Sequence, residues 1–138
     1  MKERYRWTIA FLDEYVKPGT VFPDLGYGTR LFVAEAAKRG GIVNAVDFSE
    51  SSLVATRRAV ETCVPDAKVT YVRADVQTGD FPSSDVMLAM GVTPHLTDIE
   101  AFIANAFPRT RTILCQFTDP HDWASRVRQT FSVLDVRG

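Results

Sequence analysis

The 138-residue sequence predicts an α/β fold in which a doubly wound, mostly parallel sheet carries helices on both faces. Segments with the apolar spacing of helices alternate regularly with short apolar runs typical of buried strands, which is the pattern of β–α–β units. No repeat, linker or low-complexity tract interrupts this alternation. Because 46% of the residues are hydrophobic and 24% are charged, we expect one globular domain over residues 1–138.

The first half of the chain predicts two helices, each followed by a strand. A helix around residues 5–16 ends at the run KPGT, and a second helix, over residues 30–41, ends in two glycines. The short apolar runs VFPDL and IVNAV are the first and second strands. The positions predicted to face inward are Tyr5, Ile9, Leu12 and Val16 in the first helix and Leu31, Ala34 and Ala37 in the second.

The second half continues the same alternation. Ser49 is a plausible cap for a third helix, and the runs KVTYVRAD, SDVMLAMG and RTILCQFTD predict the third, fourth and fifth strands. The run DWASRVRQT predicts a short helix, and FSVLDVR predicts one last strand. Inward positions are Leu53, Thr56, Val60 and Cys63 in the third helix and Ile99, Phe102, Ile103 and Ala106 in the helix TDIEAFIANAF.

Charge and cysteine content exclude several classes of protein. The net charge is −1, from 16 basic and 17 acidic residues, so the sequence indicates neither nucleic acid nor a membrane surface as a partner. No apolar run approaches the roughly 20 residues of a membrane-spanning helix, and the N-terminus lacks a signal-peptide pattern. Cys63 and Cys115 have no metal-binding spacing, so we expect no metal site, reduced core thiols and a cytoplasmic location.

Ligands of such sheets bind beyond the carboxyl ends of the strands, so the residues that follow each strand are the candidates for function. Four of these five clusters carry an acid at or beside the strand end, namely Asp24, Asp47, Asp75 and Asp119. The clusters are residues 24–28, Asp47 with Phe48, Asp75, residues 90–95, and residues 119–121.

The first cluster suggests which ligand is bound. Gly26 and Gly28 allow a close backbone approach before a helix N-terminus, although such a turn also serves merely to pack a helix on a strand. Asp24 would repel the pyrophosphate of a dinucleotide but would attract a cationic amine. S-adenosylmethionine has such an amine, a ribose, an adenine and no phosphate, and therefore fits the acids better.

The other acids suit the rest of this cofactor. Asp47, 21 residues after Gly26, can accept hydrogen bonds from both ribose hydroxyls, and its alternative role is that of a helix-capping surface acid. Asp75 can accept from the exocyclic amine of adenine, and otherwise is a loop acid. Phe48 can lie against the adenine face. Two strand-end residues, Val76 and Met90, complete the predicted cofactor site.

The runs VFPDLGYGTR, VDFSESSL, VRAD and SSDVMLAMGVTPHLTD resemble, in order and spacing, the motifs of class I S-adenosylmethionine-dependent methyltransferases. The resemblance implies a Rossmann-like sheet of order 3-2-1-4-5 plus one edge strand. The sequence departs from the family at Arg30, in place of the third glycine, and at Pro23 in the first strand. Arg30 either reaches the methionine carboxylate or is an exposed helix residue.

The family hairpin at the end of the sheet is incomplete, since residues for only one further strand remain. The exposed edge that results could pair with a second copy to form a homodimer. His95 is the candidate base for an acceptor that must lose a proton, and His121 is a weaker candidate. The alternative for His95 is a structural role, such as capping the following helix.

These residues predict transfer of a methyl group to a hydroxyl or amine of a small molecule. No Asn/Asp-Pro-Pro-aromatic motif follows the fourth strand, which argues against amine methylation of DNA bases. A degenerate or truncated domain that binds cofactor or a partner without catalysis is one alternative. An NAD-dependent oxidoreductase is another, which Asp24, and Leu31 at the third dinucleotide glycine, count against.

Overall fold

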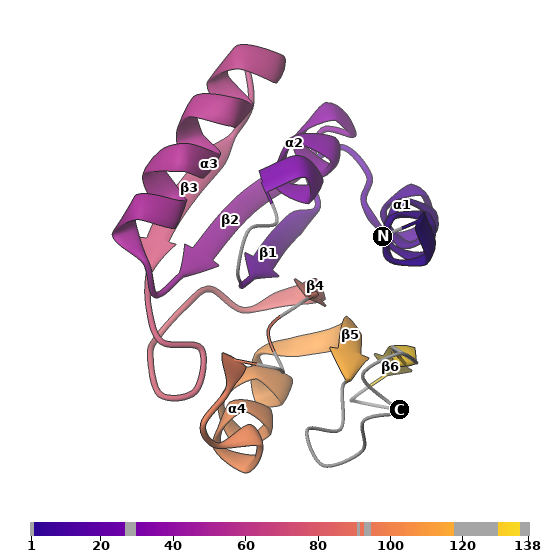
Figure 1. Cartoon of the computed structure of the whole chain (residues 1–138). Coiled ribbons are helices and arrows are strands. Elements are labelled where there is room, and N and C mark those ends of the chain that lie inside the picture. Colours follow the sequence, from indigo (N-terminus) through magenta and orange to yellow (C-terminus); the bar gives the residue numbers. More distant parts are fainter. Residues whose placement is uncertain (1, 27–29, 91, 93–94, 118–129, 136–138) are drawn as a thin grey trace.

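The structure, a computed structural model, describes residues 2–26, 30–90, 92, 95–117 and 130–135. Within them six strands form one sheet of order β3-β2-β1-β4-β5-β6 (Figure 1). Strands β1 to β5 are parallel, and β6 runs antiparallel to β5. The bounds are β1 Val21–Leu25, β2 Ile42–Asp47, β3 Val69–Arg73, β4 Ser84–Ala89, β5 Thr110–Phe117 and β6 Thr130–Asp135. The predicted fold class and strand order are confirmed.

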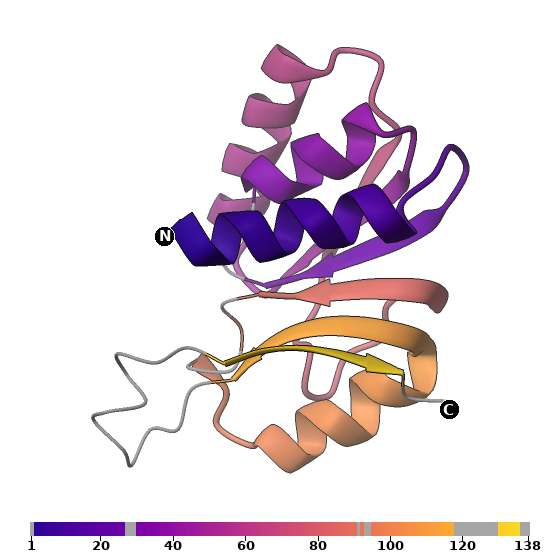
Figure 2. The same ribbon diagram turned by 90° about the vertical axis from the view of Figure 1, so that its right-hand side faces the viewer.

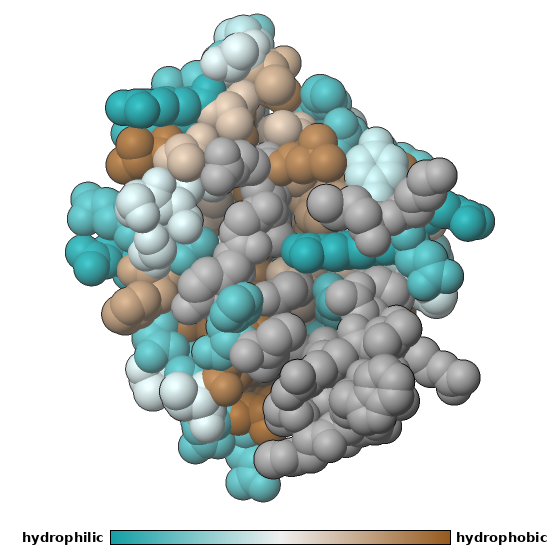
Figure 3. Space-filling view, in the orientation of Figure 1, coloured by the Kyte–Doolittle hydropathy of each residue, from teal (hydrophilic) through white to brown (hydrophobic). Residues whose placement is uncertain are grey.

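Helices cover both faces of the sheet. On one face lie α1 (Lys2–Tyr15), α2 (Arg30–Lys38) and α3 (Glu50–Cys63), and on the other lies α4 (Ile99–Ala106), which continues into the short 3-10 helix η2 (Phe107–Arg109) (Figures 1 and 2). Each face has its own apolar core, because successive side chains of a strand point to opposite sides. In the orientation of Figure 1, hydrophilic side chains form most of the visible outline, with apolar groups between them (Figure 3).

Local capping fixes where the helices begin and end. The hydroxyl of Ser49 accepts from the backbone N–H of Ser52 over 3.3 Å at the start of α3, as the sequence predicts. Asp98 caps α4 by accepting from the N–H of Ala101 over 3.0 Å. After α2 the chain turns at Gly40, whose φ of 80° favours glycine and where a Cβ would lie 2.9 Å from Pro18.

Five of the predicted inward positions are exposed instead. In α2 the residues that pack on the sheet are Phe32, Val33 and Ala36, beside the predicted Ala34 and Ala37, so the helix turns Leu31 outward. The short helix α4 buries only the i, i+4 pair Phe102 and Ala106. The exposed residues are Tyr5, Leu31, Cys63, Ile99 and Ile103.

The two cysteines therefore differ. Cys63 is the last residue of α3 and is exposed, so its assignment to the core was wrong. Cys115 lies in the middle of β5 and is buried, and burial raises the pKa of its thiol to about 12 because the thiolate cannot be hydrated there. The two thiols differ because the end of a helix is not enclosed by apolar side chains in the way that a strand inside the sheet is.

Pro23 is accommodated within β1. The N–H of Ile42 donates to the carbonyl of Thr20 over 2.8 Å, and the N–H of Gly26 donates to that of Val46 over 3.0 Å. The even-numbered residues of β1 therefore direct their N–H and C=O groups toward β2. The nitrogen of Pro23, an odd-numbered residue, points toward β4. Strand β1 is in register with β2 at five residues but with β4 at one. The missing donor thus falls on the side with the shorter pairing.

Candidate cofactor site

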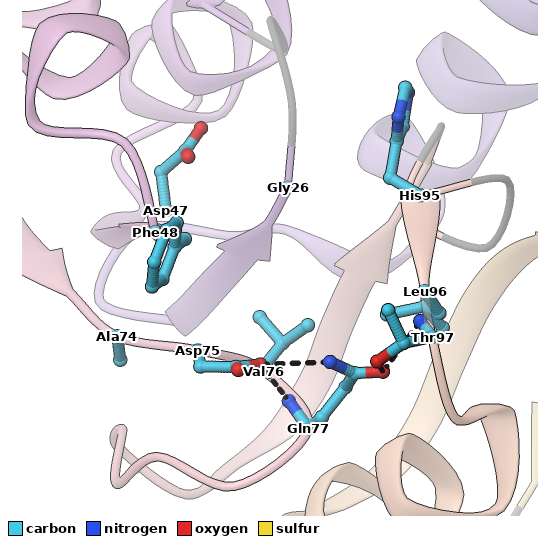
Figure 4. A pocket seen from close by; sticks show the side chains of 10 residues that line it. All are labelled: Gly26, Asp47, Phe48, Ala74, Asp75, Val76, Gln77, His95, Leu96 and Thr97. Carbon is cyan, nitrogen blue, oxygen red and sulfur yellow. Dashed lines mark hydrogen bonds between the residues drawn. The ribbon is translucent and has the colours of Figure 1, made fainter.

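A cavity of about 240 Å³ opens at the carboxyl ends of the central strands (Figure 4). Pockets for whole small ligands typically span roughly 300–1,000 Å³, so this cavity has room for part of such a ligand. The described residues that line it are Gly26, Asp47, Phe48, Ala74, Asp75, Val76, Gln77, His95, Leu96 and Thr97. They come from the segments that follow β1, β2, β3 and β4, as the parallel topology requires.

Gly26 lines this cavity directly after β1. Its φ of 123° lies in the region that favours glycine, and a Cβ at this position would collide with the side chain of Val92. A side chain here would therefore both strain the backbone and displace Val92, and so shift the turn that lines the cavity. Gly28 lies outside the described residues, and so does the side chain of Arg30.

Asp47 and Phe48 form one wall of the cavity. Asp47 is only 5% exposed, and its Oδ1 accepts from the backbone N–H of Ser49 over 2.8 Å. Burial raises the pKa of Asp47, and the N–H groups of Ser49 and Phe48 partly offset that rise by stabilising the charged form. Phe48 is 59% exposed, an unusual position for an aromatic side chain without a partner to cover it.

Asp75 lies on the segment after β3, below Phe48 in Figure 4, and is held by Gln77. Oδ1 of Asp75 accepts from the backbone N–H of Gln77 over 2.9 Å and from its Nε2 over 3.3 Å. Oε1 of Gln77 accepts from the N–H of Thr97 over 2.9 Å and from that of Asp98 over 2.8 Å. The Gln77 side chain thus joins the loop after β3 to the segment after β4 (Figure 4).

Sequence reasoning did not identify Gln77, Thr97 or Ala74. A glutamine in a polar loop has no periodicity or motif to mark it. Its position two residues after Asp75, where it can close a turn on the carboxylate, is the one signal that the sequence contains.

His95 lies at the rim of the cavity and is exposed. Its backbone N–H donates to the carbonyl of Val92 over 3.0 Å. Asp98 provides the side-chain cap of α4, so that task does not fall to His95. His121 and Asp119 lie outside the described residues.

Asp24 and Met90 are predicted cofactor residues that do not line this cavity. Asp24 is 1% exposed and Met90 is fully buried in the core under α1, α2 and α3. The structure thus brings together Gly26, Asp47, Phe48, Asp75, Val76 and His95 around one cavity. Asp24 lies behind the β1 turn, on the side that faces α1.

The described residues also bear on metal binding and on membrane insertion. No group of three or more histidine, cysteine or acidic side chains is arranged to hold a metal ion. No helix in this part of the chain has the length and apolarity needed to cross a membrane.

Comparison with known proteins identifies the class of this chain. A family model described as "Methyltransferase domain" matches residues 23–110, which is more than half of the sequence, and the chain belongs to this family. The resemblance to class I S-adenosylmethionine-dependent methyltransferases, and with it S-adenosylmethionine as the cofactor of the family, is confirmed. No curated protein sequence matches the chain.

Solved structures share its fold at low sequence identity. Magnesium protoporphyrin IX methyltransferase from Synechocystis PCC 6803, with bound S-adenosylhomocysteine, superposes with a TM-score of 0.72 at 18% identity, over 82% of this chain and 53% of that protein. YjhP from E. coli gives 0.67 at 20% over 84% and 49%. Coclaurine N-methyltransferase gives 0.63 at 20% over 78% and 35%. This chain spans about half the length of the first two proteins.

The residues around the cavity fit the adenosine part of the family cofactor. A ribose presents two hydroxyl donors, an adenine presents an amine and a flat face, and the cavity offers two carboxylates and an exposed aromatic ring. Gly26 brings the backbone of the β1 turn to the same cavity. The cavity therefore offers hydrogen-bond acceptors for the ribose and the adenine amine of the cofactor. Its described lining includes no lysine or arginine that would bind a phosphate.

Proposed function

We propose that this chain binds S-adenosylmethionine in the cavity and transfers its methyl group to a hydroxyl or amine of a small molecule. The observation that supports this most directly is the convergence of Asp47, Phe48 and Asp75 on one cavity from the ends of neighbouring strands. In this arrangement Asp47 accepts from the ribose hydroxyls. Asp75, with one oxygen held by Gln77, accepts from the adenine amine, and Phe48 covers the adenine face.

The bound cofactor supplies a sulfonium methyl group with a good leaving group, so the chain needs mainly to align the acceptor and exclude water. A base is required only when the acceptor is a hydroxyl that must lose its proton. His95, exposed at the rim, is the described residue that can take that proton on its imidazole. An amine acceptor would need no such step.

A small molecule is the acceptor that the composition favours. The net charge of −1 offers no attraction for a polyanion, and the run AMGVTP after β4 replaces the motif expected for methylation of DNA bases. A homodimer through the free edge of β6 and a cytoplasmic location remain predictions that accompany this proposal.

Calorimetric titration of the full chain with S-adenosylmethionine, S-adenosylhomocysteine and NAD tests the cofactor assignment. We expect both sulfur ligands to bind and NAD not to bind, and Asp47→Ala to weaken the sulfur ligands by about 100-fold or more, since two hydrogen bonds to a charged group are removed. The matched control is Asp66→Ala, an exposed acid in the turn after α3. Binding of NAD in place of the sulfur ligands would contradict the proposal.

Turnover needs a separate test, because a degenerate domain would also bind cofactor. Transfer of a radiolabelled methyl group to a library of small hydroxyl and amine compounds measures it. Tight cofactor binding without any transfer across such a library would favour the non-catalytic alternative. If His95 is the base, His95→Ala should lower turnover of a hydroxyl acceptor and spare that of an amine.

A further inference from the structure

The side chain of Gln77 connects the loop after β3 with the segment that leads into α4 (Figure 4). At one end, its Nε2 donates to Oδ1 of Asp75 over 3.3 Å, which is long for a hydrogen bond. At the other end, its Oε1 accepts from the N–H of Thr97 over 2.9 Å, from that of Asp98 over 2.8 Å and from the hydroxyl of Thr97 over 3.2 Å. One amide group therefore uses its donor on a carboxylate and its acceptor on the start of a helix.

Asn105 holds the same loop independently of Gln77. Its Nδ2 donates to the carbonyl of Val76 and to that of Gly79, each over 2.9 Å. Asn105 lies near the end of α4, whereas Gln77 contacts the beginning of this helix. The loop therefore stays anchored on α4 when Gln77 is replaced, and the particular contribution of Gln77 is the connection from Asp75 to the first turn of the helix.

The segment that Gln77 holds also carries His95. The backbone N–H of His95 donates to the carbonyl of Val92 over 3.0 Å, and Thr97, two residues further on, is bonded to Gln77. The backbone is thus held on both sides of the imidazole. His95 and Thr97 both line the cavity. The place of His95 at the rim therefore depends on the contacts that Gln77 makes.

We propose that Gln77 is a positioning residue, which orders the start of α4, and His95 with it, when an adenine amine binds Asp75. This inference rests on the proposed function, because it assumes that the amine donates to Asp75. Oδ1 of Asp75 is already bonded to Gln77, so the amine takes Oδ2, and a carboxylate held at both oxygens rotates less. The Gln77 amide then stays aligned with the N–H groups of Thr97 and Asp98, so the two sites are coupled through lost conformational freedom.

The consequence is an order of binding. A cofactor whose adenine is in place orders the residue that takes the proton of a hydroxyl acceptor, so the acceptor meets a complete site only after the cofactor has bound. The coupling is reciprocal, so an acceptor that holds His95 in place also strengthens the binding of adenine.

Amide hydrogen exchange at Thr97 and Asp98, followed by NMR on the isotope-labelled full chain, tests this inference. The two ligands are methylthioadenosine and its desamino analogue, in which a hydrogen atom replaces the exocyclic amine. At saturation of the wild type, exchange of both amides should be about 3- to 10-fold slower with methylthioadenosine than with the analogue, the range of one hydrogen bond. In Gln77→Leu the two ligands should give equal rates. Thr78→Ala, at the neighbouring exposed residue, is the matched control and should behave like the wild type.

A second comparison needs no ligand and separates the two ends of the Gln77 amide. Gln77→Leu should speed exchange at Thr97 and Asp98 by about 10-fold, because both amides lose their acceptor. Gln77→Glu keeps an oxygen acceptor for these amides but offers no donor to Asp75. Its exchange rates without ligand should stay within about 3-fold of the wild type, while the difference between the two ligands disappears. This variant also decides the question if Gln77→Leu does not fold.

The outcomes separate this inference from the proposed function. A ligand difference that persists in Gln77→Leu or Gln77→Glu, or equal rates with the two ligands in the wild type, would overturn the role of Gln77 alone. The amide of Ile42, bonded to Thr20 at the amino end of the sheet, is the internal reference. An equal ligand difference there would show general stabilisation and would also overturn the inference. A wild-type chain that binds neither ligand would overturn the proposed function, and the inference with it.

Discussion

Two regions near the carboxyl end of β1 hold their polar groups by different means. Around the cavity, the carboxylates of Asp47 and Asp75 are held by backbone and side-chain donors, and the ring of Phe48 is exposed. Under α1, by contrast, the carboxylate of Asp24 is almost fully buried, and the charge of the partly buried Arg4 acts on it. The first region is open to solvent and its groups are already oriented, whereas the second encloses a charge.

The two kinds of region contribute differently to binding, the first mainly to affinity and the second mainly to selectivity among ligands. Pre-oriented acceptors add affinity at little cost, because few rotamers have to be fixed on binding. A buried charge pair adds less affinity, since each charge gives up interactions that it already has, but it rejects ligands that lack the complementary charges. We therefore expect changes around the cavity to weaken all adenosine ligands.

The largest effect is expected at Gly26, which both regions share. Gly26→Ala should lower Tm by about 10 °C, because it combines an unfavourable φ with a collision against Val92, together about 2–4 kcal/mol. It should also abolish binding of S-adenosylhomocysteine, measured by calorimetry at a temperature where the variant is folded. Gly19→Ala is the control, since its φ of 86° is also positive and strains an alanine, but nothing lies within 4 Å of the added Cβ. An equal loss of binding in Gly19→Ala would show that strain alone explains the result.

The next largest effect is expected at Gln77. Gln77→Leu removes the side chain that holds Asp75 and the segment at Thr97, so the affinity for both S-adenosylhomocysteine and methylthioadenosine should fall by about 10-fold. Calorimetry with the two ligands measures this. The neighbouring exposed residue offers a control, Thr78→Ala, which should leave both affinities unchanged. A loss of affinity restricted to S-adenosylhomocysteine would contradict this prediction, because it would show that Gln77 acts on the amino-acid end of the ligand and not on the adenine end.

A smaller effect is expected at Phe48. Phe48→Ala should lower the affinity for both adenosine ligands by about 3- to 10-fold, the range of one aromatic contact, and leave Tm unchanged because the ring is exposed. Val54→Ala, at an exposed apolar residue of α3, should change neither quantity. A marked drop in Tm would show instead that Phe48 packs on the protein and has a structural task.

Much of this could be predicted from the sequence because it depends on local patterns. The alternation of strands and helices fixes a parallel sheet, and that sheet brings Asp47 and Asp75 to one edge. Rules of helix capping identify Ser49. These predictions need only the spacing of residues along the chain, which is visible without any tertiary contact.

The rest depends on contacts between distant segments. Which side of α4 meets the sheet is decided by Phe102 and Ala106, and apolar spacing alone assigned Ile99 and Ile103 to the core as well. The antiparallel direction of β6 cannot be seen in its residues. The electrostatic influence of Asp24 on Arg4 spans 20 positions and requires α1 to lie over β1. Gln77, likewise, acquires its importance from Thr97, on another loop.

The smallest effect is expected on the stability of Asp47→Asn. This substitution should stabilise the protein without ligand although it weakens ligand binding. Burial raises the pKa of Asp47, so the native state holds the proton more tightly than the unfolded state. The stabilisation from this proton is present below about pH 4 and is lost as pH rises through the native pKa, so at pH 7 the charged carboxylate destabilises the protein without ligand.

An uncharged amide keeps the acceptor for the N–H of Ser49 and removes that cost. Asp47→Asn should therefore raise Tm at pH 7 by about 1–3 °C, with the gain vanishing toward pH 4, and weaken S-adenosylhomocysteine by about 10-fold. Thermal unfolding between pH 4 and pH 8 measures the first effect. A lower Tm for Asp47→Asn across this range would mean that the carboxylate stabilises the turn before α3 by more than its burial costs.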